Sequence, residues 1–437
     1  MGAPDRVRWN LLAAPPARWA LRSPLFPVAL QAVALAALCL LAANGLSGGS
    51  ASAAELLVLR RANLTTLVVW GLWWPAMIAV ALTLGRLWCM VCPLELANRL
   101  GETVARRLGK RRARMPGPFR EGWSALAVYV SLQVLTAGVA MDSSPRATGL
   151  LLPVLVGLAV GAGLLFRSPR SFCRALCPAS PLLAVYSRFT PVQLDVAKPE
   201  VCAHCKSKDC VRTDLRHRFD GRSCPSALRP YERRQLDGCV ACLQCAKVCP
   251  KQNVALGLVH RSAPSRKLER LAPFTAAYLA VDTGFVANEI IEDVPWLEGP
   301  FHFVPGVLTG VLPHFGSGWL EALWFLALFP ALLWGTVAVL AYARGHCGPL
   351  GSLLVSATTA AAPVIALAHL AKAVNKAAGW SAWLPAALAN PSGRSALVGE
   401  VAARPPVTAV WVVGALALAV AAAFCAGSWR RSAWMRE

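Results

Sequence analysis

Eight apolar runs dominate this chain, and each is long enough to cross a lipid bilayer as a helix. Such a crossing takes about 20 residues. The chain has 437 residues, of which 56% are hydrophobic and 15% are charged, whereas charged residues make up about 25% of an ordinary soluble protein. The composition therefore excludes an ordinary soluble enzyme. The predicted spans are 23–45, 64–84, 122–141, 149–166, 272–290, 318–342, 352–374 and 405–427.

Lysine and arginine are distributed unevenly over the segments between the spans. Of the 44 Lys and Arg residues, 37 lie in segments 1–22, 85–121, 167–271, 343–350 and 428–437. The positive-inside rule places these segments and both termini on the cytoplasmic side of a bacterial-type inner membrane. This asymmetry explains the net charge of +22 without a nucleic-acid partner. One basic block suits anionic lipid headgroups; it contains Arg106, Arg107, Lys110, Arg111, Arg112 and Arg114.

Eight cysteines lie between residues 202 and 249 in two groups of four, and proline follows the last cysteine of each group. The second group reads C-x2-C-x2-C-x3-C-P, which is the spacing of a bacterial ferredoxin half, and the first is a stretched version of it. In this pattern three close cysteines bind one [4Fe–4S] cluster, and the remote cysteine binds the other cluster. The predicted ligands of cluster 1 are Cys202, Cys205, Cys210 and Cys249. Those of cluster 2 are Cys239, Cys242, Cys245 and Cys224.

Zinc is the alternative for these cysteines, because paired C-x2-C motifs also suit a tetrahedral zinc ion. The two terminal C-P units favour iron–sulfur clusters instead. A reducing cytosol also argues against a disulfide framework.

A second cysteine pattern is repeated at the cytoplasmic ends of two spans, where an arginine precedes two cysteines and a proline. The cysteines are Cys89, Cys92, Cys173 and Cys177. Three interpretations stay open. Four thiolates are a complete ligand set for a third cluster or another metal. Two pairs can also cycle between dithiol and disulfide, and a buried cysteine can be an inert hydrophobic residue.

Two acidic residues, Asp282 and Glu289, lie within the fifth predicted span, seven positions apart and hence on one helical face. Ionisable residues within a membrane are costly and usually face a polar cavity, a proton path or a quinone pocket. We therefore regard the pair as a candidate quinone or proton site; a solvated interfacial pair is the alternative. Haem is not expected, because it needs two axial histidines and only His369 lies clearly within a span.

The two C-P span ends followed by tandem ferredoxin halves resemble the NosR/NapH-type membrane polyferredoxins, which are 4Fe-4S binding membrane proteins. Oxidase assembly proteins of the CcoG type share this layout. The similarity covers residues from about 64 to 256. The first span end departs from the family pattern, because it reads C-x2-C-P instead of C-x3-C-P.

This resemblance implies a membrane-bound iron–sulfur protein that passes single electrons between quinone or a cytoplasmic donor and a partner oxidoreductase. An electron-transfer subunit is expected before a stand-alone enzyme, and any catalysis would be that of an oxidoreductase. The alternative function is an assembly factor that reduces metal or thiols of a client respiratory metalloenzyme.

We therefore expect a mainly α, polytopic membrane protein with about eight spans and a small cytoplasmic α+β insert similar to a two-cluster ferredoxin. Residues 1–190 are predicted to form a membrane domain with the two Cys-Pro helix ends, and residues 191–256 the tandem-cluster domain. Residues 257–437 are predicted to form a second membrane domain without an assigned role. Basic residues near the clusters suit an acidic electron donor; the alternative is that they solvate the surface and follow the membrane topology. They are Lys206, Lys208, Arg212, Arg233, Arg234, Lys247 and Lys251.

Overall fold

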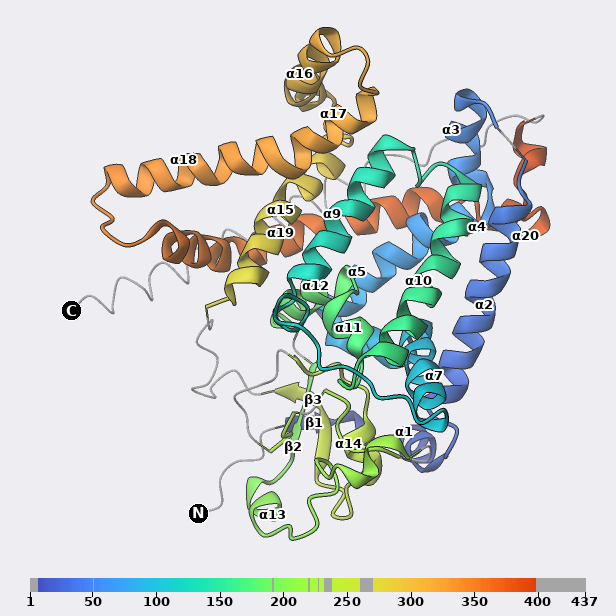
Figure 1. The fold of residues 1–437 in the computed structure, drawn as a ribbon, viewed down its shortest axis with the longest axis vertical. Coiled ribbons are helices and arrows are strands. Elements are labelled where there is room, and N and C mark those ends of the chain that lie inside the picture. Colours follow the sequence, from blue (N-terminus) through green and yellow to red (C-terminus); the bar gives the residue numbers. More distant parts are fainter. Residues whose placement is uncertain are drawn as a thin grey trace. The chain divides into compact units, whose positions relative to one another are not determined.

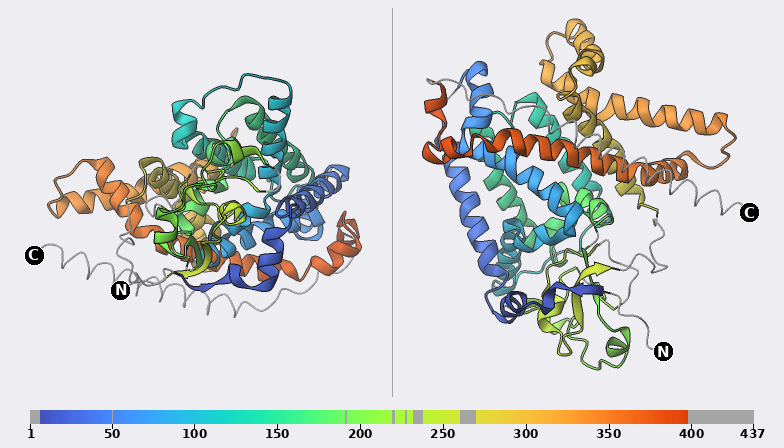
Figure 2. Two further views of the ribbon diagram at one scale, coloured as in Figure 1. Left: turned by 90° about the horizontal axis from the view of Figure 1, so that it is seen from below. Right: turned by 180° about the vertical axis from the view of Figure 1, so that it is seen from behind.

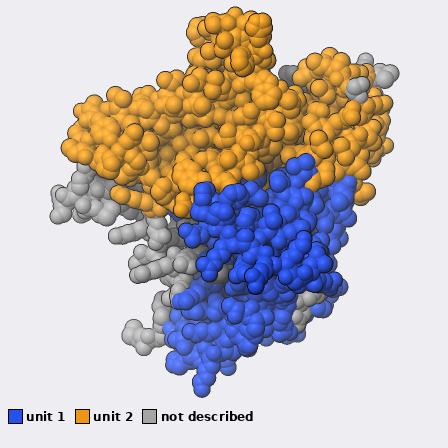
Figure 3. All heavy atoms as spheres, in the orientation of Figure 1, with its two compact units in different colours: residues 1–39, 80–120, 154–269 blue, residues 40–79, 121–153, 270–437 orange. Residues whose placement is uncertain are grey.

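The structure is a computed structural model that describes residues 7–49, 51–190, 192–218, 221–226, 228–231, 238–259 and 270–397. Most of these residues are helical, which confirms the predicted mainly α class (Figure 1). The chain divides into two compact units, which are coloured separately in Figure 3. Unit 1 comprises residues 1–39, 80–120 and 154–269, and unit 2 comprises residues 40–79, 121–153 and 270–437.

Within the part of the chain that the structure describes, five helical segments are long and apolar enough to cross a membrane, as expected for a membrane protein. They are Val28–Ser47 (α2), Leu64–Thr83, Pro145–Leu165 (α10), Ser317–Ala343 and Leu350–Ser381 (α19). Each coincides with one of the predicted spans. Two further predicted spans form α9 (Trp123–Gly138), which is shorter, and α15 (Pro273–Ile291). The eighth, 405–427, lies outside the described residues, so the count of eight stays a prediction.

A small antiparallel sheet frames the cysteine-rich segment of unit 1. Its strands are β1 (Val7–Asn10), β2 (Val192–Val196) and β3 (Val254–Val259), in the order β1-β3-β2. The pairing of β2 with β3 runs from Val192 opposite Leu258 to Val196 opposite Val254. The two ends of the cysteine-rich segment are therefore adjacent. Strand β1 was not anticipated, and Leu12 just after it joins Leu194 and Leu256 in one buried core.

The helices of unit 1 are short except where α7 (Pro93–Arg107) lies against α10. Their backbones approach closely because glycines line the contact. A Cβ atom on Gly163 would lie 2.1 Å from the carbonyl oxygen of Asn98, and one on Gly101 would lie 2.2 Å from that of Val160. The remaining α-helices are α1 (Pro15–Arg22), α6 (Trp88–Val91), α8 (Gly117–Glu121), α11 (Ser171–Ala175), α12 (Ala179–Tyr186), α13 (Pro199–Ala203) and α14 (Gln244–Val248).

Unit 2 is built around α15, which packs against α9 and along α19 (Figures 1 and 2). Two of its long apolar helices contain a π-helical stretch, at Leu67–Trp73 and at Trp324–Leu328. Such stretches are frequent at functional sites. The other helices are α3 (Ala53–Ala62), α4 (Leu64–Thr66), α5 (Trp74–Thr83), α16 (Pro295–Val311), α17 (Ser317–Leu323), α18 (Phe329–Ala343) and α20 (Leu384–Ala389).

The close approach of α7 and α10 yields a stability prediction. We expect Gly163→Val to lower the free energy of unfolding by about 1–3 kcal/mol, because the added side chain has no room beside the α7 backbone. Gly157→Val on the same helix is the matched control, since a Cβ atom there meets open space. Thermal unfolding of the purified protein in detergent measures both. Equal melting temperatures for the two variants would contradict this packing.

Candidate metal centres

The four cysteines predicted to bind cluster 2 line one cavity. They are Cys224, Cys239, Cys242 and Cys245. Cys239 and Cys242 belong to the loop that leads into α14, Cys245 lies in the first turn of α14, and Cys224 comes from the other cysteine group. Leu194 and Val240 contribute apolar walls. Burial raises the pKa of Cys239 to about 12, so without a cation this thiol stays protonated at neutral pH.

The four cysteines predicted to bind cluster 1 line a second cavity. They are Cys202, Cys205, Cys210 and Cys249. Asn253 supports two of their sulfur atoms: its Nδ2 lies 3.2 Å from Sγ of Cys202, and its backbone N–H donates to Sγ of Cys249 at 3.4 Å. The backbone N–H of Cys224 donates to the carbonyl oxygen of Cys210 at 2.8 Å. This hydrogen bond closes the stretched insert of the first cysteine group, and it joins a predicted ligand of cluster 1 to a predicted ligand of cluster 2.

The backbone of the cysteine loops is bent into the left-handed region. Ala241 and Leu243 have φ values of 45° and 58°, and Lys208 has a φ of 42°. Non-glycine residues seldom adopt this conformation, and it persists at functional sites. A left-handed residue next to a right-handed one directs successive N–H groups into a concavity that suits anions and iron–sulfur clusters. In agreement, the N–H of Ala241 donates to the sulfur of Cys239.

Among the described residues, no three His, Cys, Asp or Glu side chains converge closely enough to hold one metal ion. The eight cysteines line the two cavities in two sets of four.

The cysteines at the span ends also come together in the described part of unit 1. Cys92 interacts electrostatically with the other three, which are Cys89, Cys173 and Cys177. Burial raises the pKa of Cys92 well above its usual value and that of Cys177 to about 12. All 14 cysteines within the described residues are free thiols.

The prolines of the two C-P motifs explain how the thiols are held. Proline has no N–H group, so the next residue supplies the first free N–H of the following helix. The N–H of Leu94 donates to the sulfur of Cys92, and that of Ala179 donates to the sulfur of Cys177. These cysteines therefore lie at the positive ends of α7 and α12, where a thiolate is stabilised.

A buried ionic cluster accompanies the two cysteine sets, and the sequence analysis did not anticipate it. The guanidinium of Arg222 forms a buried ion pair with Glu95, and Gln31 Nε2 donates to the other carboxylate oxygen of Glu95 at 2.8 Å. Burial alone would raise the pKa of Glu95, but Arg222 and Arg170 outweigh burial and hold this pKa at about 2. One member of this cluster had a signal in the sequence, because it is the arginine that precedes the cysteines and proline of a span-end motif.

Arg170 is that arginine, and its charge reaches both cysteine sets. Its Nη2 lies 3.8 Å from Sγ of Cys173, and it also interacts electrostatically with Cys89 and Cys242. The side chain is 3% exposed. One buried cation thus stabilises thiolates of the span-end set and of the cluster 2 set.

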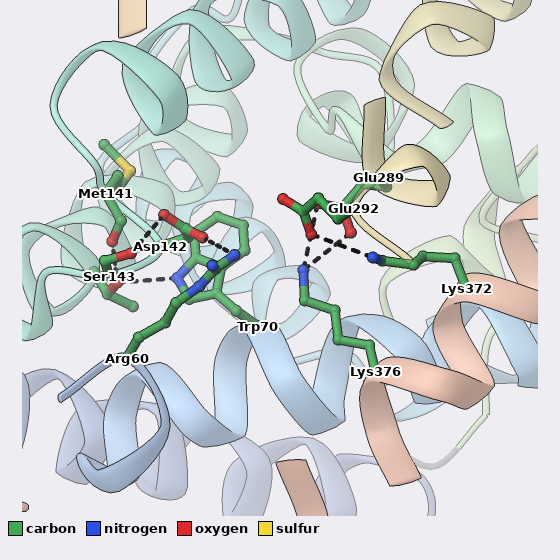
Figure 4. A network of polar contacts seen from close by, with 10 residues as sticks. Arg60, Trp70, Met141, Asp142, Ser143, Glu289, Glu292, Lys372 and Lys376 are labelled. Atoms are coloured by element: carbon green, nitrogen blue, oxygen red, sulfur yellow. Dashed lines mark hydrogen bonds and ion pairs between the residues drawn. The ribbon is translucent and has the colours of Figure 1, made fainter. Parts of the chain in front are cut away.

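The two acidic residues of α15 differ in their surroundings in unit 2. Asp282 is fully buried, and its Oδ1 accepts a hydrogen bond of 2.7 Å from Tyr129 Oη. Glu289 forms an ion pair of 3.1 Å with Lys376 (Figure 4). Asp282 is therefore not a solvated interfacial residue. Tyr129 and Lys376 complete the site, and neither was singled out from the sequence.

The basic residues near the cysteines have mixed roles. Lys247 Nζ donates to the carbonyl oxygens of Ser23 and Phe26 at 2.8 and 2.7 Å, which fixes the segment after α1. Lys208 and Lys251 line the cavity of Cys202. Arg233 and Arg234 lie outside the described residues.

Comparison with known proteins gives one partial match. An uncharacterized protein of Methanocaldococcus jannaschii is 26% identical over 177 residues, which are 40% of this chain and 65% of that protein. The chain thus spans slightly less than two thirds of the length of this relative. No protein-family model matches the chain, and no solved structure matches it.

The buried ion pair predicts a large effect of removing one partner. We expect Arg222→Met to lower the free energy of unfolding by about 3–5 kcal/mol, because it leaves the Glu95 carboxylate buried without its cation. The double variant E95L/R222M should recover much of this loss, since it removes both charges. Chemical denaturation of the purified variants measures the difference. A double variant no more stable than R222M would contradict this explanation.

The low pKa of Glu95 also predicts a pH dependence. Because the folded pKa is about 2 and the ordinary value is 4.5, the carboxylate stabilises the fold above pH 4.5. This contribution is lost as the pH falls from 4.5 towards 2. Melting temperatures of the wild type and Glu95→Gln across this range test it, and their difference should shrink with falling pH. A constant difference would contradict the assignment.

Proposed function

We propose that this chain is a membrane-bound electron-transfer protein with two [4Fe–4S] clusters held by the two cysteine cavities. When bound, such clusters supply one-electron transfer. The proposal is supported above all by the composition of each cavity. Three neighbouring cysteines of one group are joined there by the remote C-P cysteine of the other group, as in a two-cluster ferredoxin.

The protein's own residues would tune these sites. Donors from Asn253 and from the backbone of the cysteine loops reduce the negative charge on sulfur, and hydrogen bonds to sulfur help to set cluster potentials. Arg170 acts in the same direction on Cys242. Because Arg170 also interacts with Cys89 and Cys173, we propose that the span-end cysteines take part in electron transfer as a third metal site or as a redox dithiol.

We place the cysteine-rich segment on the cytoplasmic side of an inner membrane, on the basis of the positive-inside rule. Its electron donor would be a cytoplasmic carrier or quinone, and its acceptor a partner redox complex. The cavity of Cys202 is lined by Lys208 and Lys251, and these charges favour an acidic carrier.

Metal analysis tests this function. Anaerobically purified protein should contain about eight irons and as much acid-labile sulfide per chain, or about twelve irons if the span-end cysteines hold a third cluster. Zinc, or no metal after reconstitution, would overturn the proposal. Replacement of the four span-end cysteines by serine distinguishes the two cases. It should lower a content of about twelve irons to about eight, and it should leave a content of about eight irons unchanged.

Each cysteine group is predicted to supply its remote cysteine to the cluster of the other group, and this prediction gives a sharper test. Cys224→Ser should remove the same EPR signal as Cys245→Ser, although the two residues belong to different cysteine groups. Cys249→Ser should remove the other signal, together with Cys202→Ser. Cys347→Ser is the matched control, because this cysteine is exposed. Loss of one signal by both C224S and C202S would contradict the assignment.

A further inference from the structure

The insert that stretches the first cysteine group, residues 211–223, is strongly basic. Its arginines are Arg212, Arg216, Arg218 and Arg222. Arg212 pairs with Asp214, and Arg222 pairs with Glu95. The carbonyl oxygen of Arg218 accepts a hydrogen bond of 3.0 Å from Arg99 of α7, which attaches the insert to that helix. Arg216 differs from these, because its Nε is buried without a hydrogen-bond partner among the described residues.

Further arginines lie near Arg216, at the end of α7. His217 interacts electrostatically with Arg106 on the last turn of α7 and with Arg112 just beyond it. It also interacts with Arg216, its neighbour in the insert. Partial burial and these positive charges lower the pKa of His217 to about 4, so the imidazole is neutral at pH 7. Three guanidinium groups therefore carry the positive charge of this arginine cluster.

The acidic residues of α7 do not neutralise the arginine cluster. Glu95 is the ion-pair partner of Arg222. Glu102 is buried and accepts a hydrogen bond of 3.1 Å from the N–H of Arg170; it acts on Arg112 electrostatically, without an ion pair. Like charges held together in this way repel one another. The cluster therefore favours an anion from outside the described chain, and guanidinium groups suit phosphate oxygens.

The arginine cluster lies at the end of an apolar helix, α10, which is long enough to cross a membrane. The close contact of α7 with α10 involves Val160 and Leu164, in the last two turns of α10 (Figure 1). Arg112 Nη1 donates to the carbonyl oxygen of Phe166 at 3.2 Å, directly after α10 ends. The N–H of Ala113 donates to the carbonyl oxygen of Leu165 at 2.7 Å. The arginines are thus fixed where such a helix would leave the bilayer.

A row of exposed apolar side chains runs along α7 beside these arginines. Leu100, Val104 and Leu108 are 49%, 45% and 63% exposed. Their spacing of four residues places them on one face of the helix and its C-cap. A helix that carries both an apolar row and arginines suits the boundary between lipid headgroups and acyl chains.

We propose that α7 and the basic insert form a binding site for an anionic phospholipid. Arg106, Arg112 and Arg216 bind its phosphate group, and its acyl chains lie along the apolar row of α7. The lipid supplies the negative charge that the arginine cluster lacks within the described chain. It also attaches the insert of the cysteine-rich segment to the membrane surface.

This site gives the stretched insert a role that a ferredoxin half does not need. The bacterial spacing leaves only three residues before the last cysteine, whereas here thirteen residues separate Cys210 from Cys224. The additional residues bring Arg216 to the end of α7. The proposal does not rest on the iron–sulfur assignment, because no cysteine belongs to the lipid site.

Native mass spectrometry of the full-length protein in detergent tests the selectivity of the site. The protein is titrated with phosphatidylglycerol and with phosphatidylcholine of the same acyl chains, and the wild type should bind phosphatidylglycerol more tightly. Equal affinities for the two lipids would overturn the proposal without any variant. Inorganic phosphate that binds as tightly as phosphatidylglycerol would overturn it as well, since the site would then take a free anion.

Variants of the arginines test the location of the site. Arg106→Gln and Arg216→Gln should each weaken phosphatidylglycerol binding about fivefold, because one arginine near a membrane surface contributes about 1 kcal/mol. Binding of phosphatidylcholine should not change. Arg344→Gln is the matched control, because Arg344 is an exposed arginine directly after another long apolar helix. Wild-type affinity in the double variant R106Q/R216Q would overturn the proposal.

Photo-crosslinking locates the acyl chains. Phosphatidylglycerol with a photoreactive group in its acyl chain should label the peptide that contains Leu100, Val104 and Leu108, and R216Q should reduce this labelling. Labelling of that peptide at the same level in R216Q as in the wild type would overturn the site. Iron content is measured on the same samples. Normal iron without lipid selectivity rejects the lipid site alone, and lipid selectivity without iron rejects the electron-transfer proposal alone.

Discussion

The buried ion pair of Glu95 and Arg222 is the interaction on which unit 1 depends. It joins the first turn of α7, which follows a span-end cysteine, to the segment that ends at Cys224. Separating the two would leave a carboxylate and a guanidinium in an apolar interior, which costs several kcal/mol per ion. The pair therefore holds the cysteine-rich segment against α7, and the positive charge of Arg170 reinforces it.

Unit 2 also contains charged residues in apolar surroundings, but their arrangement differs from that in unit 1. There the charged residues lie on the faces of two long helices, and they range from the exposed Glu292 to the fully buried Asp282. In unit 1 a compact ionic cluster fixes a geometry. In unit 2 the ion pairs are spread along two helices, and Lys372 and Lys376 of α19 contact carboxylates at the end of α15. Both arrangements use the same few residue types, so position determines the role.

Local patterns were predictable and distant pairings were not. Hydropathy is a property of neighbouring residues, so five of the predicted spans coincide with helices that are long and apolar enough to cross a membrane. The cysteine spacing likewise anticipated which thiols share a cavity. Strand β1 gave no signal, because four residues acquire strand character only through pairing with β3. The partners of Glu95 and Glu289 lie far along the chain, and no local rule connects them.

The pairing of β1 with β3 determines when the sheet can form during synthesis of the chain. Val7 is synthesised before both cysteine groups, whereas its partner Val259 is synthesised only after them. The sheet that frames the cysteine-rich segment cannot form before then. During this interval strand β1 has no neighbour to pair with. Completion of β3 then brings the two ends of the cysteine-rich segment together.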